Sequence, residues 1–227
     1  MAVDIRFLGQ SAVELQSGSS TVLVDPFLTG NPKAAATADE VSPDVILLTH
    51  GHADHLGDTV DIAKRTGAPV LAIVELAHEL SGEGIEVFDP NLSGTVAFDW
   101  GWVKLVPAWH SSTTPNGTVC PPAGLLIMVG ETLVYHLGDT CLFSDLQLIA
   151  RRGNPVDLAL VPIGGHYTMD RFDAVTAVEF IDPSVVIPVH YNTFPPIETD
   201  AEAFKADVES QTSAKVVILA PGETHSA

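Results

Sequence analysis

The segment THGHADH (residues 49–55) decides how this sequence is interpreted, because it places His50, His52, Asp54 and His55 within one short loop. Residues i and i+2 of an extended segment point to the same side, so His50 and His52 can bind one metal ion together. Asp54 and His55 follow a bend and can reach a second ion. Imidazole and carboxylate are standard zinc donors. The segment therefore predicts a metal site, and a solvated histidine-rich loop is the disfavoured alternative.

The segments around this loop predict a layered α/β fold. Residues 45–48 are Val-Ile-Leu-Leu, a continuous apolar run typical of a strand buried on both faces. Three apolar segments between residues 3 and 25, separated by Ser and Gly turns, predict an antiparallel meander. Strand and helix patterns alternate further along the chain. We expect one metallo-hydrolase domain over residues 1–227, an α/β four-layer αββα sandwich in which helices cover two packed sheets.

Helical patterns occur at three places that matter later. Residues 58–66 form an amphipathic stretch that ends at Gly67, and Asp58 can cap it. Residues 144–152 and 171–181 also predict helices. Each of these segments is expected on the outside of a sheet.

Three further donors come from distant parts of the chain. His110, Asp139 and His190 each follow an apolar segment that predicts a strand. Sites in open α/β sheets gather at the carboxyl ends of the strands. Each residue alone has an ordinary explanation, but three strands that end in the same class of donor favour one shared metal site.

The order of these motifs resembles the metallo-β-lactamase superfamily. The motifs are the 49–55 loop, WH at 109–110, GDT at 138–140 and PVH at 188–190. The stretches LVDPF and HYNTFP narrow the similarity to small single-domain metal-dependent hydrolases distantly similar to ascorbate-6-phosphate lactonase. The resemblance covers nearly the whole chain, and its motifs are specific for fold and metal site but not for substrate.

The resemblance implies a dinuclear centre and assigns its ligands. Two divalent ions are expected, with zinc favoured and manganese, nickel or iron as alternatives. Such a pair can supply a hydroxide at neutral pH for attack on a small ester, lactone or phosphoester. Asp54 is expected to ligate one ion and to orient or shuttle a proton. The first ion takes His50, His52 and His110, the second takes Asp54, His55 and His190, and Asp139 bridges both.

Four further residues are candidates for supporting roles or substrate contacts. Asp25 follows an apolar strand and can accept the second N–H of a metal-bound imidazole. Cys141 lies two residues after Asp139, and a thiolate there could alter coordination. His166 follows a predicted strand, and Asn192 lies just after the last donor. The two cysteines are too few for a disulfide framework, so both are expected to be reduced and buried.

Composition excludes several classes of function. The net charge is -19, with 10 Lys and Arg against 29 Asp and Glu, so a nucleic acid is not an expected partner. No apolar run is long enough to span a membrane, and the start lacks the pattern of a signal peptide. We therefore expect a cytoplasmic enzyme that acts on a small molecule.

Two other hypotheses are compatible with the sequence. The first is a mononuclear iron enzyme with dioxygenase-like redox chemistry, and the second is a metal-stabilised binding module without catalysis. No nucleophilic-serine elbow and no phosphate-binding glycine loop occurs, so serine hydrolysis and nucleotide chemistry are disfavoured. The bond that is cleaved, the native metal and the oligomeric state cannot be read from the sequence.

Overall fold

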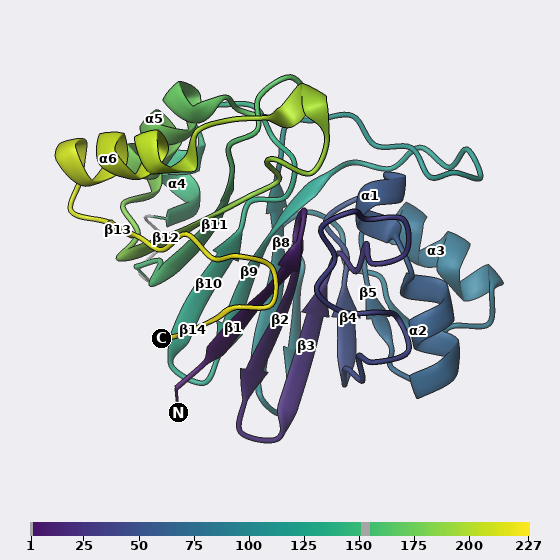
Figure 1. The fold of residues 1–227 in the computed structure, drawn as a ribbon. Coiled ribbons are helices and arrows are strands. Elements are labelled where there is room, and N and C mark those ends of the chain that lie inside the picture. Colours follow the sequence, from purple (N-terminus) through teal and green to yellow (C-terminus); the bar gives the residue numbers. More distant parts are fainter. Residues whose placement is uncertain (1, 151–154) are drawn as a thin grey trace.

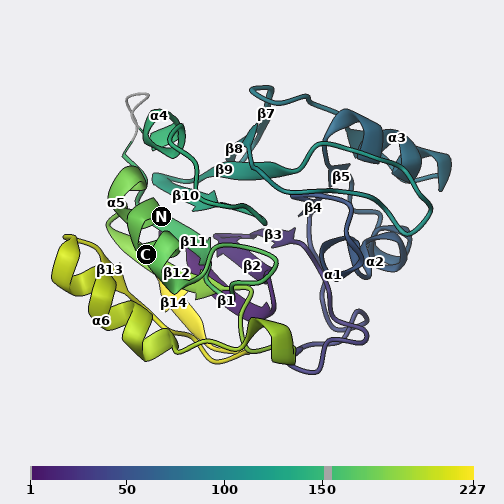
Figure 2. The same cartoon turned by 90° about the horizontal axis from the view of Figure 1, so that it is seen from above.

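Two seven-stranded sheets pack face to face in the computed structural model, which describes residues 2–150 and 155–227. Helices α1 to α3 lie outside one sheet and α4 to α6 outside the other (Figures 1 and 2). This arrangement confirms the predicted αββα sandwich. Among the described residues, no helix has the length and apolar character needed to cross a bilayer.

The first sheet has the order β14-β1-β2-β3-β4-β5-β6. Its first three strands in the chain form the predicted antiparallel meander, and β4 to β6 add to it in parallel. The edge strand β14 pairs with β1 and was not predicted. The strands are β1 (Asp4–Gly9), β2 (Ala12–Ser17), β3 (Ser20–Val24), β4 (Val45–Leu47), β5 (Val70–Leu71), β6 (Val87–Phe88) and β14 (Thr224–Ser226).

The second sheet has the order β13-β12-β11-β10-β9-β8-β7. Its four earlier strands are antiparallel, and β11 to β13 continue from β10 in parallel. The strands are β7 (Thr95–Phe98), β8 (Gly101–Pro107), β9 (Ala123–Val129), β10 (Thr132–His136), β11 (Leu158–Pro162), β12 (Val185–Val189) and β13 (Lys215–Val216).

Six α-helices and one 3₁₀ turn connect the described strands. The predicted helix at 171–181 is found with the same bounds, whereas residues 151 and 152 of the helix predicted at 144–152 lie outside the described residues. The helices are α1 (Ala53–Leu56), α2 (Thr59–Thr66), α3 (Val74–Gly82), α4 (Leu146–Ala150), α5 (Arg171–Ile181) and α6 (Ala201–Gln211), with η1 (Pro195–Ile197).

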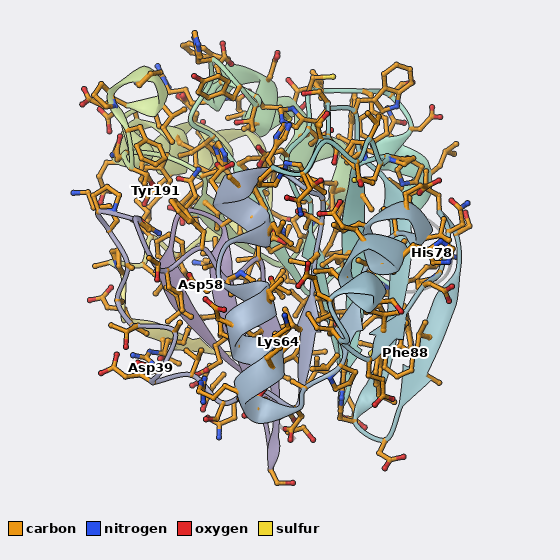
Figure 3. All side chains as sticks on the ribbon, turned by 90° about the vertical axis from the view of Figure 1, so that its right-hand side faces the viewer. Asp39, Asp58, Lys64, His78, Phe88 and Tyr191 are labelled. Atoms are coloured by element: carbon orange, nitrogen blue, oxygen red, sulfur yellow. The ribbon has the colours of Figure 1, made fainter. Side chains whose placement is uncertain are left out.

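The predicted cap of α2 is wrong in its chemistry. Asp58 does stand at the N-cap position, but its side chain makes no bond to the helix. Its carboxylate instead accepts from the backbone N–H groups of Leu28 (2.9 Å) and Thr29 (2.8 Å). Figure 3 shows Asp58 at the start of α2 and Lys64 further along the same helix. The carboxylate thus fastens the 26–30 loop to α2 rather than satisfying the helix end.

The two sheets meet through an apolar layer and through polar bonds at one edge. Strands of both sheets contribute buried side chains to one continuous apolar cluster. At the edge, the His190 backbone N–H donates to the Gln10 carbonyl (2.7 Å), and the Ala123 N–H donates to the Thr49 carbonyl (2.9 Å). These bonds hold the two sheets together at the edge where the predicted donors lie.

Gly138 permits the close approach of the second sheet to the metal-binding loop. Its φ is +63°, and a Cβ at this position would lie 2.8 Å from the Ala123 carbonyl oxygen and 3.0 Å from Thr49 Cβ. A larger residue would therefore push β10 away from the loop. The glycine thus sets where the next residue, Asp139, enters the site.

Candidate metal centre

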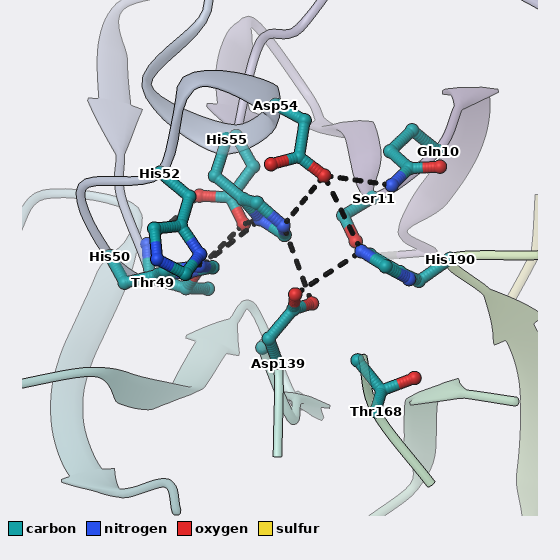
Figure 4. Close-up of polar contacts among 12 residues, drawn as sticks. Gln10, Ser11, Thr49, His50, His52, Asp54, His55, Asp139, Thr168 and His190 are labelled. Atoms are coloured by element: carbon teal, nitrogen blue, oxygen red, sulfur yellow. Dashed lines mark hydrogen bonds and ion pairs between the residues drawn. The ribbon is translucent and has the colours of Figure 1, made fainter. Parts of the chain in front are cut away.

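All seven side chains predicted as metal donors converge at one edge of the two sheets. Figure 4 labels all of them except His110. They form three overlapping groups in which the potential ligand atoms lie within 4.8 Å of one another. The groups are His50, His52 and His110; His50, His55 and Asp139; and Asp54, His55 and His190.

The 49–55 loop supplies four of these donors because the chain changes direction within it. His50 follows the end of β4 by three residues, and His52 has extended backbone at the N-cap position, directly before α1 begins. This single helical turn directs Asp54 and His55 toward the second sheet (Figure 4). The bend was predicted from the sequence, but its helical form was not. His50 and His55 are fully buried, whereas the Asp54 side chain keeps 31% of its surface exposed.

His190 enters the site from the end of β12 with an unusual backbone. Its φ is +55°, in the left-handed region that a non-glycine residue seldom adopts. Gly164 lies beneath it, and a Cβ there would come within 2.3 Å of the His190 carbonyl oxygen. The strained histidine is held by its bond to Gln10 and by this close packing, a pattern common at functional sites.

The unpartnered atoms of the cluster fit a cation. Three buried atoms face its middle without a hydrogen-bond partner among the described residues: His55 Nε2, Asp139 Oδ1 and His190 Nε2. His55 Nε2 lies 3.3 Å from Asp139 Oδ1, and His190 Nε2 lies 3.2 Å from Asp139 Oδ2. Buried polar atoms left without partners are costly, and a shared metal ion would satisfy all three.

The pKa values of two histidines also indicate that the cluster favours positive charge when no cation is bound. Burial lowers the pKa of His190, but Asp139 and Asp54 outweigh it and raise that pKa to about 9. The pKa of His55 is likewise raised well above its ordinary value, since Asp139 and Asp25 outweigh burial. Two imidazoles therefore hold protons where cations would otherwise neutralise the carboxylates.

His50 behaves in the opposite way. Burial, aided by the charge of His55, holds the pKa of His50 well below its usual value. Its Nδ1 lies 3.0 Å from Thr49 Oγ1, which in turn lies 2.6 Å from Asp25 Oδ2. Because the hydroxyl donates to the carboxylate, it accepts from His50 Nδ1–H. This leaves a lone pair on His50 Nε2, as a neutral ligand requires.

Asp25 lies where a supporting carboxylate was predicted. It is fully buried, and its Oδ2 accepts from His55 Nδ1 at 2.7 Å. Its Oδ1 also accepts from the Thr49 backbone N–H at 2.8 Å. The carboxylate thus fixes the proton of His55 on Nδ1 and turns Nε2 toward Asp139.

Gln10 was missed by the sequence reasoning. It is 1% exposed, adopts φ +56° after β1, and its Nε2 donates to Asp54 Oδ2 at 2.9 Å. Gln10 also follows a strand, so the rule that found the other strand-end donors could have singled it out. It was overlooked because an uncharged amide is not a typical metal ligand.

Three predicted candidates belong to none of the donor groups. Cys141 is exposed, so the prediction that both cysteines are buried holds only for Cys120. His166 is exposed and does not line the cleft that opens over the donors. The side chain of Asn192 accepts from the Thr199 N–H at 2.8 Å and borders a separate surface hollow.

A cleft of about 450 Å³ opens over the donors. Asp54, Asp139 and His190 form its floor, and Tyr167 and Phe194 stand among its walls. Sites for small molecules commonly have volumes of about 300–1,000 Å³. The cleft thus has the size for a small substrate placed directly against the donor cluster.

Comparison with known proteins agrees with the geometry. Residues 4–190 match the model of the beta-lactamase superfamily domain. A metal-dependent hydrolase of Thermus thermophilus is 47% identical, with 97% of each chain covered. The structure of a metallo hydrolase from the archaeon Ignicoccus hospitalis covers 100% of this chain and 99% of its own, with 37% identity and a TM-score of 0.92.

The fold is also shared by an enzyme of different chemistry. A diiron β-hydroxylase from Streptomyces venezuelae matches 99% of this chain and 54% of its own, with 18% identity and a TM-score of 0.78. At this identity the likeness concerns the fold alone. The choice between hydrolysis and iron chemistry therefore rests on the donor residues and on the more similar relatives.

Proposed function

Because this chain belongs to the metallo-β-lactamase superfamily and is a metal-dependent hydrolase, we propose that it binds two divalent cations and hydrolyses a small ester, lactone or phosphoester. The observation that carries the proposal is the convergence of His55 Nε2, Asp139 Oδ1 and His190 Nε2, which are buried and find no hydrogen-bond partner in the described part of the chain. We also propose that the chain forms one metallo-hydrolase domain and acts in the cytoplasm.

The donor set divides into two ligand groups around a shared carboxylate. His50, His52 and His110 make up one group, and Asp54, His55 and His190 make up the other. Asp139 contacts histidines of both groups, since its carboxylate lies 3.5 Å from His110 Nε2 and 3.2 Å from His190 Nε2. Asp139 is thus the candidate for the bridging ligand. Mixed imidazole and carboxylate donors favour zinc.

The side chains of this protein position the reaction around that centre. When bound, a pair of divalent cations supplies hydroxide at neutral pH and polarises the oxygen of the scissile group. Asp54 is the carboxylate of the cluster with the most exposed side chain, and it borders the cleft. It can accept the proton of the attacking water and pass it to the leaving group. Gln10 holds the Asp54 Oδ2 atom at 2.9 Å and so fixes the direction of that carboxylate.

Metal analysis combined with two matched variants tests the proposal. We expect two zinc or manganese ions per chain by plasma mass spectrometry, and hydrolysis within a panel of esters, lactones and phosphoesters. The variants His52→Ala and Asp54→Ala should fold, as judged by circular dichroism, and lose that hydrolysis. The control is His78→Ala, because His78 has a side chain that is 71% exposed and lies outside the donor groups.

Three results would contradict the proposal. Wild-type turnover in a folded His52→Ala or Asp54→Ala variant would remove the assigned roles. One iron per chain, together with oxygen-dependent activity, would favour the redox reading. A metal-loaded protein that turns over no member of the panel would favour a binding module.

A further inference from the structure

Among the described residues that line the cleft over the donor cluster, there is no Lys or Arg. The chain as a whole carries only 10 Lys and Arg. Lys33 lines a separate hollow that shares Gln10 alone with the cleft. Arg171 forms an ion pair with Asp207. The Arg65 side chain donates hydrogen bonds to the carbonyls of Ala38 and Val41.

This absence bears on which group can be bound and cleaved. Sites that transfer or cleave phosphoryl groups commonly use Arg or Lys beside the metal to neutralise the phosphate oxygens. Because no Lys or Arg lines the cleft in the part of the chain that the structure describes, that charge would come from the cations. Asp54 and Asp139 belong to the donor groups and Asp25 contacts His55, so these three carboxylates would cancel most of that charge, and the net charge of the chain is -19. An anionic substrate therefore meets a repulsive surface and a site with little spare positive charge.

The walls of the cleft are suited to an apolar group instead. Tyr167 comes from the loop after β11 and is 56% exposed, so its ring is available at the mouth. Phe194 lies directly before η1, and its ring lies near the ring of Phe27, with centroids 6.4 Å apart. Pro196 and Ile197 extend the same apolar wall. Aromatic and aliphatic walls gain free energy when they exclude water from an apolar substrate.

From the two observations together we infer that the substrate is an uncharged carboxylic ester or lactone whose apolar acyl portion lies against Phe194 and Tyr167, and not a phosphoester. The inference rests on the proposed hydrolysis. The acyl carbonyl sits toward the donor cluster, and the apolar portion points toward η1. Water adds to the carbonyl carbon, the carbon–oxygen bond to the leaving alcohol breaks, and the proton lost by the water is returned to that alcohol, giving an acid and an alcohol.

Four substrates that share the same leaving group, p-nitrophenol, test the reaction class. The zinc-loaded full chain is assayed with p-nitrophenyl acetate, p-nitrophenyl hexanoate, p-nitrophenyl phosphate and bis-p-nitrophenyl phosphate. We expect kcat/KM for hexanoate to exceed that for acetate by about tenfold, which is below the limit for complete burial of the added methylenes. Both esters should exceed both phosphoesters by more than about 100-fold. In Phe194→Ala the preference for hexanoate should fall to about twofold, mainly through KM.

A binding measurement gives a readout that does not depend on turnover. By titration calorimetry on the zinc-loaded chain, hexanohydroxamate should bind about tenfold more tightly than acetohydroxamate, and inorganic phosphate should bind weakest. Phe194→Ala should remove the difference between the two hydroxamates. Phe172→Ala is the matched control, because Phe172 is 62% exposed on α5, outside the cleft lining, and should change neither readout.

The outcomes separate this inference from the proposed function. Efficient hydrolysis of either phosphoester, or tight binding of inorganic phosphate, overturns the inference and leaves the metal-dependent hydrolase standing. The inference is also overturned if the ratio of kcat/KM for hexanoate to kcat/KM for acetate is the same in Phe194→Ala as in the wild type. If the zinc-loaded chain turns over none of the four substrates faster than Asp54→Ala does, the proposed function fails, and the inference fails with it.

Discussion

Replacing Asp25 by asparagine should weaken metal binding without changing the shape of the side chain. The carboxylate accepts three bonds, from His55 Nδ1 (2.7 Å), Thr49 Oγ1 (2.6 Å) and the Thr49 backbone N–H (2.8 Å). An amide in Asp25→Asn has one accepting atom and one donating group. If the donor replaces Oδ2, it faces His55 Nδ1, and His55 must move its proton to Nε2. That tautomer cannot ligate a cation.

The other orientation of the amide has a different cost. If the donor replaces Oδ1, it faces the Thr49 N–H, and a buried donor is left unpaired at about 1–3 kcal/mol. Loss of a partner that orients a metal-bound histidine typically costs 10- to 100-fold in affinity, which is about 1.4–2.7 kcal/mol. We therefore expect Asp25→Asn to bind the ion of the His55 group at least tenfold more weakly.

Chelator competition with zinc, followed by plasma mass spectrometry of the dialysed protein, measures this effect. The matched control is Asp58→Asn, since Asp58 is also a buried carboxylate that accepts backbone N–H groups but touches no histidine. The control should lose stability in urea unfolding and keep wild-type zinc affinity. The reasoning is refuted if Asp25→Asn binds both ions as tightly as the wild type does.

Three more predictions follow from the site and from the backbone. Without a cation the pKa of His190 is raised to about 9. Its protonation therefore stabilises the metal-free protein fully below a pH of about 6.5, and this stabilisation is lost as the pH rises through about 9. Zinc binding at pH 7 should therefore release protons, which calorimetry in two buffers of different ionisation enthalpy detects; no buffer dependence would contradict this. Gln10→Ala should lower kcat by about tenfold, the effect of losing a hydrogen bond to a charged group, with metal content unchanged; a drop in metal content would instead make Gln10 a structural support. In Gly57→Ala the new Cβ would lie 2.3 Å from the Pro26 carbonyl oxygen, so the free energy of unfolding in urea should fall by about 3 kcal/mol or more. The control Gly67→Ala, at a left-handed φ with open space around it, should lose about 1 kcal/mol. Equal losses in the two variants would show that the close contact at Gly57 is relieved.

Much of the donor cluster could be predicted because the relevant rule is geometric. Parallel strands bring their carboxyl ends to one edge of a sheet, and the apolar runs before His50, Asp139 and His190 are visible in the sequence. The spacing in the 49–55 loop gave the shared face of His50 and His52 directly. The convergence of donors from both sheets then follows from the face-to-face packing of the layers.

The misses have equally physical causes. Strand β14 pairs with β1 through Thr224–Ser226, and this short polar segment carries no alternating pattern. Cys141 was expected to be buried because a reduced cysteine commonly behaves as a small hydrophobic residue. The chain leaves the strand at Gly138, with φ +63°, so the alternation of faces no longer applies and the thiol turns to solvent. Substrate contacts were not readable, because the walls of the cleft come from loops with no periodic signal.

The sharing of Asp139 between histidines of both sheets has a consequence for the life of the protein in the cell. His55 belongs to the loop after β4, and Asp139 belongs to the loop after β10. A cation held by both would cross-link two distant chain positions and close a long loop, as a disulfide does. Ligands that bind only the native state also protect it against unfolding and degradation. Scarcity of metal would therefore lower the amount of this enzyme that survives proteolysis, in addition to silencing the copies that remain.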